Sequence, residues 1–145
     1  MEEKIILLVE DNPSDIGLTV RAFNRSRIRN KLVIVQDGQE ALEYLLGPQH
    51  GDPCAARLPA VVLLDLKLPK VDGIEVLRRI RGDIRTKRLP VVILTSSDEQ
   101  RDLTDCYDEG ANSYIRKPVD FNQFAEAVRQ LGLYWLVLNE APPDS

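Results

Sequence analysis

Three charged clusters in this sequence each follow directly on a short, mostly apolar run: Glu10 with Asp11, then Asp65, then Lys117. The first two runs, rich in Val, Ile and Leu, are typical of strands buried on both faces of a parallel sheet. Ligands of such sheets bind at the carboxyl ends of the strands. We therefore expect the carboxylates and the ammonium group to meet at one edge, as an acidic cation pocket beside a lysine that can bind phosphate.

The residue types in these clusters predict phosphoryl chemistry. Mg²⁺ suits such a pocket, because it binds through one or two carboxylates, keeps several waters and often bridges to phosphate oxygens. Asp11 and Asp65 suit the role of direct ligands, and Glu10 can act directly or through water. A carboxylate held by a cation can attack phosphorus and form an aspartyl phosphate. Thr95, at the end of a predicted strand, can donate a hydroxyl hydrogen bond to a phosphoryl oxygen.

Strand and helix patterns alternate five times along the chain and must position these residues. Apolar runs predict strands at 5–9, 32–35, 60–64, 91–94 and 113–116. Apolar spacing and caps predict helices that open at Asn12-Pro13, cover 41–46 and 74–80, and open again at Asp98 and Asp120. The alternation favours right-handed parallel crossovers and a three-layer α/β sandwich. The flavodoxin-like strand order 2-1-3-4-5 is one of two common solutions, and it makes Asp11 and Asp65 neighbours.

Composition narrows the class of protein. With 145 residues, 43% hydrophobic residues, 29% charged residues and a net charge of −4, the chain is expected to form one cytoplasmic globular domain. No apolar run approaches the ~18 residues of a membrane span, and no signal peptide precedes the first strand. The acidic balance argues against nucleic acid as a partner. The basic run at 78–88 is interpreted as a solvated face.

Most of these residues also have a plain structural explanation when each is taken alone. An Asp after a strand often forms a turn or caps a helix, and Lys117 before Pro118 could be a solvated lysine in a loop. Their co-occurrence at several strand ends, together with Thr95, favours the functional interpretation. The cysteines, Cys54 and Cys106, are expected to be free thiols. The alternation of His50, Asp52 and Cys54 is interpreted as a solvated loop, because a zinc site usually needs four ligands.

The same motifs resemble a response-regulator receiver domain of two-component signalling, over residues 4 to about 131. The matching motifs are Leu8-Val9-Glu10-Asp11-Asn12, Leu64-Asp65-Leu66-Lys67-Leu68-Pro69 with Asp72-Gly73, Thr95-Ser96 and Lys117-Pro118. The resemblance implies that Asp65 accepts the phosphoryl group and that Glu10, Asp11 and Asp65 build the Mg²⁺ site. It adds the backbone carbonyl of Lys67 as a metal ligand and gives Lys117 a contact to the phosphoryl group.

The resemblance also implies a conformational switch and a partner. Thr95 and Tyr114 match the switch hydroxyl and the switch aromatic residue of receivers, and Lys117-Pro118 matches a cis peptide. A sensor histidine kinase is the expected phosphoryl donor, and it would dock on the first helix and the loops at the strand ends. Such a protein is expected to act as a switch rather than as an enzyme.

A narrower resemblance links the chain to single-domain regulators that partner bacterial phytochromes. It rests on the motif at 9–15, the long loop before the third strand, the motif at 65–70 and the aromatic pair Tyr134-Trp135. Lys67 stands where close relatives often have a polar amide, so we expect it to alter the lifetime of the phosphoryl group.

The predicted domain covers residues 1–131, and residues 132–145 form a C-terminal extension with a short disordered end. The extension is too short for an output domain, so signalling is expected to pass through contacts with another protein. Its apolar residues are Leu133, Tyr134, Trp135, Leu136, Val137 and Leu138. They either pack on their own domain or form a homodimer interface, and we favour the homodimer.

Two other classes of function stay open at this point. A metal-dependent phosphohydrolase of the haloacid-dehalogenase type also uses an Asp at a strand end, but that family needs a second Asp two residues later, where this chain has Lys67. A phosphorylation-independent interaction module would not need the full acidic set, Thr95 and Lys117. The sequence identifies neither the cognate kinase and its stimulus nor the downstream target.

Overall fold

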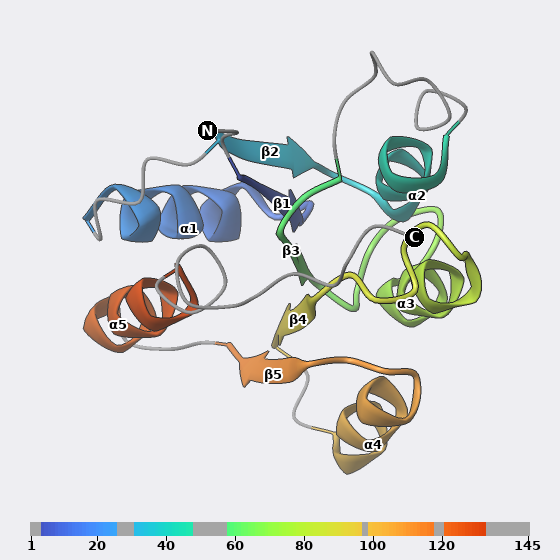
Figure 1. Cartoon of the computed structure of the whole chain (residues 1–145). Helices are drawn as coiled ribbons and strands as arrows, with labels where there is room; N and C mark the ends of the chain where they lie inside the picture. Colours follow the sequence, from blue (N-terminus) through green and yellow to red (C-terminus); the bar gives the residue numbers. More distant parts are fainter. Residues whose placement is uncertain (1–3, 26–30, 48–57, 97–98, 118–120, 133–145) are drawn as a thin grey trace.

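The chain folds around a five-stranded parallel sheet (Figure 1). The computed structural model describes residues 4–25, 31–47, 58–96, 99–117 and 121–132. The strands are β1 (Ile5–Val9), β2 (Lys31–Val35), β3 (Val61–Leu64), β4 (Val91–Thr95) and β5 (Ser113–Arg116). The helices are α1 (Pro13–Arg25), α2 (Gly38–Leu46), α3 (Gly73–Gly82), α4 (Gln100–Asp108) and α5 (Phe121–Gly132). The predicted α/β alternation is confirmed, and β2 begins one residue before its predicted start.

The strand order is β2-β1-β3-β4-β5, which confirms the flavodoxin-like prediction. In this order β1 lies between β2 and β3, so the chain crosses over the sheet in opposite directions on either side of β1. The register aligns Val9 with Leu64 and Leu64 with Ile93. The residues that follow β1 and β3 therefore emerge side by side at the carboxyl edge of the sheet, where ligands of such sheets bind.

Alternate strand residues enter two separate hydrophobic cores, one on each face of the sheet. Leu7 and Ile93 belong to the core that also holds Leu77 of α3 and Cys106 of α4. Ile6 and Leu8 pack instead against residues of α1 and α5. Figure 1 shows the same arrangement, with α1 and α5 on one face of the sheet and α2, α3 and α4 on the other. The three predicted layers are thus confirmed.

Polar side chains begin three of the helices. The Asn12 side chain accepts hydrogen bonds from the backbone N–H groups of Ser14 (2.9 Å) and Asp15 (3.2 Å), which confirms the predicted cap of α1. Asp37 and Asp72 cap α2 and α3 in the same way. Predicted caps at Asp98 and Asp120 lie outside the described residues. At the start of α4, Glu99 occupies the cap position and its side chain makes no capping hydrogen bond.

A close backbone approach fixes the loop between β3 and α3 against the strand end. The Gly73 N–H donates to the carbonyl oxygen of Leu66 at 2.8 Å. A Cβ atom at Gly73 would collide with the backbone of Asp65 and Leu66, so only glycine fits there. This contact holds the segment directly after Asp65 in place.

The basic run at 78–88 is largely engaged within the chain. Arg78 and Arg79 pair with Glu75, and Arg85 pairs with Asp83. The Arg81 guanidinium donates to the backbone carbonyls of Gly110, Leu89 and Lys87 and to the Asn112 side chain. The side chains of Arg78 and Arg79 remain about half exposed, and the interpretation of the run as a solvated face stays a prediction. Across the described ranges, no helix has the length and apolar character needed to cross a membrane.

The two cysteine predictions have different outcomes. Cys106 is a buried free thiol, and burial, with the nearby Asp102 and Asp105 carboxylates, raises its pKa to about 11. A thiol in this state is a poor nucleophile at neutral pH. The loop that holds His50, Asp52 and Cys54 lies outside the described residues, so its interpretation stays a prediction.

Candidate functional site

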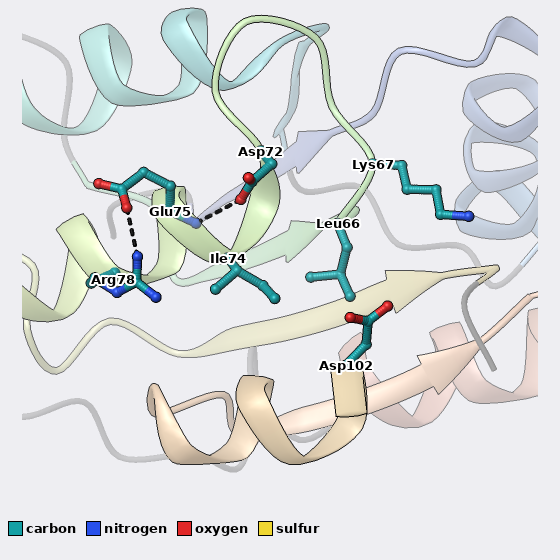
Figure 2. A pocket seen from close by; sticks show the side chains of 7 residues that line it. All are labelled: Leu66, Lys67, Asp72, Ile74, Glu75, Arg78 and Asp102. Carbon is teal, nitrogen blue, oxygen red and sulfur yellow. Dashed lines mark hydrogen bonds and ion pairs between the residues drawn. The ribbon is translucent and has the colours of Figure 1, made fainter. Parts of the chain in front are cut away.

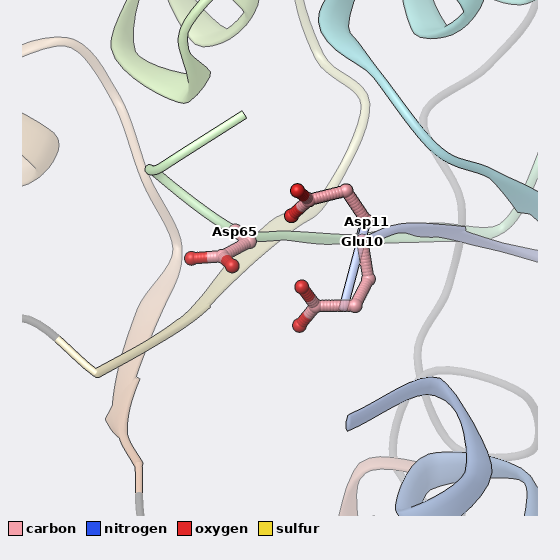
Figure 3. Close-up of side chains that lie close together, drawn as sticks. All are labelled: Glu10, Asp11 and Asp65. Atoms are coloured by element: carbon pink, nitrogen blue, oxygen red, sulfur yellow. The ribbon is translucent and has the colours of Figure 1, made fainter. Parts of the chain in front are cut away.

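The predicted carboxylates meet at the carboxyl edge of the sheet. The Asp65 N–H donates to the carbonyl of Val9 at 3.1 Å and thereby places Asp65 beside Glu10. One carboxylate oxygen each of Glu10, Asp11 and Asp65 lies within 4.8 Å of the others, and Figure 3 shows the three groups close together. Glu10 and Asp65 are buried, with 2% and 8% exposure, whereas Asp11 is exposed. The cluster is therefore buried at Glu10 and Asp65 and open to solvent at Asp11.

Lys117 completes the site from β5, on the far side of β4. Its N–H donates to the carbonyl of Thr95 at 2.6 Å. Its ammonium nitrogen lies 2.6 Å from Glu10 Oε1, 2.8 Å from Asp15 Oδ2 and 3.7 Å from Asp65 Oδ2. The lysine side chain is only 8% exposed. A buried lysine needs such partners, because an unpaired ammonium group would lose its hydration without compensation.

The electrostatics of the site follow from this crowding. Burial raises the pKa of Glu10 to about 7, the Asp65 carboxylate acts in the same direction, and the hydrogen bond from Lys117 opposes both. For Lys117, burial disfavours the charged form, but the hydrogen bonds to Asp15 and Glu10 outweigh it and raise the pKa. Three carboxylates, those of Glu10, Asp15 and Asp65, lie within 4 Å of the Lys117 ammonium group. Asp11 adds a fourth carboxylate to the same site, and this excess of negative charge favours an additional cation.

Asp15 is the site residue that the sequence reasoning missed. It lies within the motif at 9–15, which assigns it no role. A signal was available, because Asp15 lies four residues after Asp11, in the first turn of α1, and that turn starts at the same sheet edge. The proximity to Lys117 could not be predicted from the sequence, since it joins residues 102 positions apart.

The main chain after Asp65 also faces the carboxylate. The Lys67 N–H donates a long hydrogen bond of 3.4 Å to Asp65 Oδ1. The Lys67 side chain is exposed, whereas its backbone N–H reaches the Asp65 carboxylate. Figure 2 shows this side chain extending outward from the β3–α3 loop.

The two predicted switch residues lie on the same face of the sheet. Tyr114 is aligned with Ile93 in the register between β5 and β4, and Thr95 is two residues further along β4. Because strand side chains alternate, Thr95 and Tyr114 share the face that α4 covers. Thr95 is fully buried, and Tyr114 is partly buried against that core. The predicted cis peptide involves Pro118, which lies outside the described residues.

A pocket of about 340 Å³ lies beside the acidic cluster, between the β3–α3 loop, α3 and the start of α4 (Figure 2). Its lining residues are Leu66, Lys67, Asp72, Ile74, Glu75, Arg78 and Asp102. Arg78 pairs with Glu75 inside it, and Asp72 caps α3. The three clustered carboxylates do not line it, so the pocket adjoins the candidate site at Lys67 without including the acidic cluster.

Together, the doubly wound parallel sheet and this strand-end cluster of acids, lysine and threonine define a signalling receiver. The chain belongs to the response regulator receiver domain family, whose profile matches residues 6–129. Phosphorylation of an aspartate is typical of that family, and its members are in general signalling proteins without enzymatic activity.

Relatives support this assignment over nearly the whole chain. The probable methanogenesis regulatory protein FilR2 of Methanothrix harundinacea is 43% identical over 95% of this chain and 87% of its own length. The response regulator Rcp1 of a Synechocystis species is 37% identical over 92% of this chain and 89% of its own. Its Mn²⁺-bound crystal structure matches with a TM-score of 0.82 and 36% identity, covering 97% of this chain and 99% of that chain.

The crystal structure of a phosphorylated relative also matches this chain. The phosphorylated cyanobacterial phytochrome response regulator RcpA matches with a TM-score of 0.85 and 40% identity, over 98% of this chain and 100% of that chain. The resemblance to phytochrome response regulators is therefore confirmed. The chain is a response regulator of the receiver type.

Proposed function

We propose that this regulator accepts a phosphoryl group on Asp65 from a sensor histidine kinase and signals through altered protein contacts. The observation that carries the proposal is the cluster of Glu10, Asp11 and Asp65 with Lys117 directly beside it. Asp65 suits the role of acceptor because its carboxylate belongs to the acidic cluster and also lies 3.7 Å from the Lys117 ammonium group. In the transfer, the P–N bond of the kinase phosphohistidine breaks as an Asp65 oxygen bonds to phosphorus, and the imidazole leaves with the electron pair.

The acidic cluster fits a divalent cation, and we propose Mg²⁺. Carboxylate oxygens within 4.8 Å of one another can share an ion whose bonds to oxygen are about 2.1 Å long. Glu10, Asp11, Asp65 and the carbonyl of Lys67 would hold it. When bound, the ion neutralises charge on the phosphoryl oxygens. Lys117 adds a second positive charge, and its position 3.7 Å from Asp65 Oδ2 leaves it in reach of a phosphoryl oxygen.

Thr95 and Tyr114 are proposed to transmit the change. The Thr95 hydroxyl would donate to a phosphoryl oxygen, and Tyr114 would follow on the same face of the sheet. The helix α4 packs over that face. The surface around α4 and β5 is therefore the proposed site of altered contacts.

The proposed donor is a phytochrome-type histidine kinase. Support comes from RcpA and Rcp1, since RcpA is named a phytochrome response regulator and both match nearly the whole chain. The regulator is proposed to work in the cytoplasm, to bind neither nucleic acid nor membrane, and to perform no catalytic turnover. The receiver boundary at residue 131 belongs to the same proposal.

A homodimer formed through residues 132–145 is also proposed. It rests on the run of apolar residues at 133–138, because an apolar segment of this size is stabilised by burial against a second chain. Sedimentation of the full chain and of a chain that ends at Gly132 tests it. The shorter chain should be monomeric, and an unchanged association state would exclude the extension as the interface.

Incubation with Mg²⁺ and acetyl phosphate, followed by intact-mass measurement, tests the main proposal. The expected result is a mass increase of one phosphoryl group that requires Mg²⁺ and is absent in Asp65→Asn. An absent adduct in a folded wild-type protein would favour an interaction module. Sustained release of inorganic phosphate at enzymatic rates would favour a phosphohydrolase.

A further inference from the structure

Lys117 is held by two carboxylates from different parts of the chain. A carboxylate oxygen of Glu10, at the end of β1, lies 2.6 Å from the Lys117 nitrogen. A carboxylate oxygen of Asp15, in α1, lies 2.8 Å from the same nitrogen. An ammonium group has three N–H donors in a fixed tetrahedral arrangement. Two acceptors at hydrogen-bond distance therefore orient the group, and the third donor remains for the Asp65 side, 3.7 Å away.

The backbone of Asp15 is itself fixed at both ends. Its N–H donates to the Asn12 side chain at 3.2 Å, within the cap of α1. Its carbonyl accepts a hydrogen bond from the Thr19 hydroxyl at 2.9 Å, and Thr19 is 2% exposed. Asp15 thus projects from an anchored helical turn, and it can hold the ammonium group in a defined place at little cost in side-chain entropy.

Asp15 differs from Glu10 in one respect that matters for the reaction. Glu10 belongs to the three-carboxylate cluster, whereas Asp15 does not. Glu10 also accepts a hydrogen bond from the Asn12 N–H at 3.3 Å. When Glu10 contributes to cation binding, its carboxylate is shared between that cation and the Lys117 ammonium group, so it holds Lys117 less firmly. Asp15 has no such second duty and keeps Lys117 in place.

We propose that Asp15 is a positioning residue for phosphoryl transfer, which fixes the Lys117 ammonium group so that its remaining donor faces the phosphoryl group at Asp65. The inference rests on the proposed function of Asp65. It also gives α1 a direct connection to the reacting group, since a shift of the first turn of α1 would move Lys117.

The prediction concerns the rate of phosphorylation by acetyl phosphate. In this step the bond between phosphorus and the acetate oxygen breaks as the Asp65 oxygen bonds to phosphorus, and acetate leaves with the electron pair. Asp15→Ala should slow the step about tenfold, because Lys117 keeps only one anchor. Asp15→Asn should stay within about threefold of wild type, because its amide oxygen still accepts from the ammonium group.

A double-mutant cycle separates positioning from a general effect on the fold. Asp15→Ala and Asp15→Asn are measured in the wild-type and Lys117→Ala backgrounds, with Asp15→Ser as a second shortened variant. Glu43→Ala, which removes an exposed carboxylate from α2, is the matched control and should not change the rate. In the Lys117→Ala background, Asp15→Ala should have no further effect.

The outcomes are distinct. A wild-type protein without an Asp65 adduct defeats the proposed function itself. A wild-type protein that is phosphorylated, with an unchanged or faster Asp15→Ala rate, overturns the role of Asp15 alone. So does an equal loss in both backgrounds, or a loss in Asp15→Asn as large as in Asp15→Ala. If Asp15→Ala does not fold, the comparison of Asp15→Asn with Asp15→Ser decides in the same way.

Discussion

At the scale of single residues, the site is governed by the balance between one ammonium group and the carboxylates around it. The Lys117 ammonium group is shared by Glu10, Asp15 and, at longer distance, Asp65. Burial leaves Glu10 with a pKa of about 7, so without a further cation this carboxyl group takes up a proton near neutral pH. Cation binding and protonation therefore compete for the same oxygen atoms.

The raised pKa of Glu10 predicts how stability changes with pH. The folded chain holds the Glu10 proton more tightly than the unfolded chain, where the pKa is 4.5 instead of about 7. The resulting contribution to the free energy of unfolding is complete below about pH 4.5 and is lost as the pH rises through about 7. Denaturant titrations with a chelator should show wild type losing stability relative to Glu10→Gln over this range. A constant difference between the two proteins would contradict the prediction.

At the scale of elements, the sequence was sufficient for the sheet and insufficient for the contacts between loops. Continuous apolar runs such as 5–9 predicted buried strands because both sheet faces are covered. Acidic side chains at strand ends predicted the site because the carboxyl ends of parallel strands share one edge. Asp15 and the Arg81 contacts were missed, since both join segments that are distant in the sequence, and periodicity carries no information on such pairs.

The surroundings of Gly73, at the end of the β3–α3 loop, and of Gly17, in α1, predict opposite effects for two glycine substitutions. Gly73→Ala should lower the free energy of unfolding by about 1 to 3 kcal/mol, because the new Cβ collides with the backbone of Asp65 and Leu66. Gly17→Ala, in the middle of α1 with open space around it, should raise it by up to about 1 kcal/mol. Chemical denaturation measures both. Equal effects of the two substitutions would show that the loop can relax around the added methyl group.

Arg81 predicts a difference between two arginines of the same helix. Its guanidinium holds the carbonyls of Leu89 (2.6 Å) and Gly110 (2.8 Å) and so ties α3 to the segments before β4 and β5. Arg81→Lys should cost about 1 to 3 kcal/mol of unfolding free energy, because an ammonium group cannot reach these acceptors together. Arg79→Lys, at an exposed pair with Glu75, should cost less than about 0.5 kcal/mol. Thermal or denaturant unfolding of both variants checks this, and similar losses would contradict it.

At the scale of the whole molecule, the two ends of the parallel strands differ in their contacts. The Arg81 contacts and the turn after α3 stabilise the end of the sheet where β4 and β5 begin. The carboxyl ends of the strands gather the carboxylates, Lys117 and Thr95. A phosphoryl-controlled switch requires charged groups where the added charge can act, and a well-tied opposite end of the sheet that keeps the fold in place.

The central claim is that Asp65 carries the phosphoryl group, and locating the modified residue tests it most directly. Protein incubated with Mg²⁺ and acetyl phosphate is treated with borohydride, which reduces an acyl phosphate to an alcohol, and peptide mass analysis then identifies the position. We predict conversion of Asp65 to homoserine in the presence of Mg²⁺ and no conversion when a chelator is added. Conversion at Asp11 or Asp15 with Asp65 left intact would contradict the account.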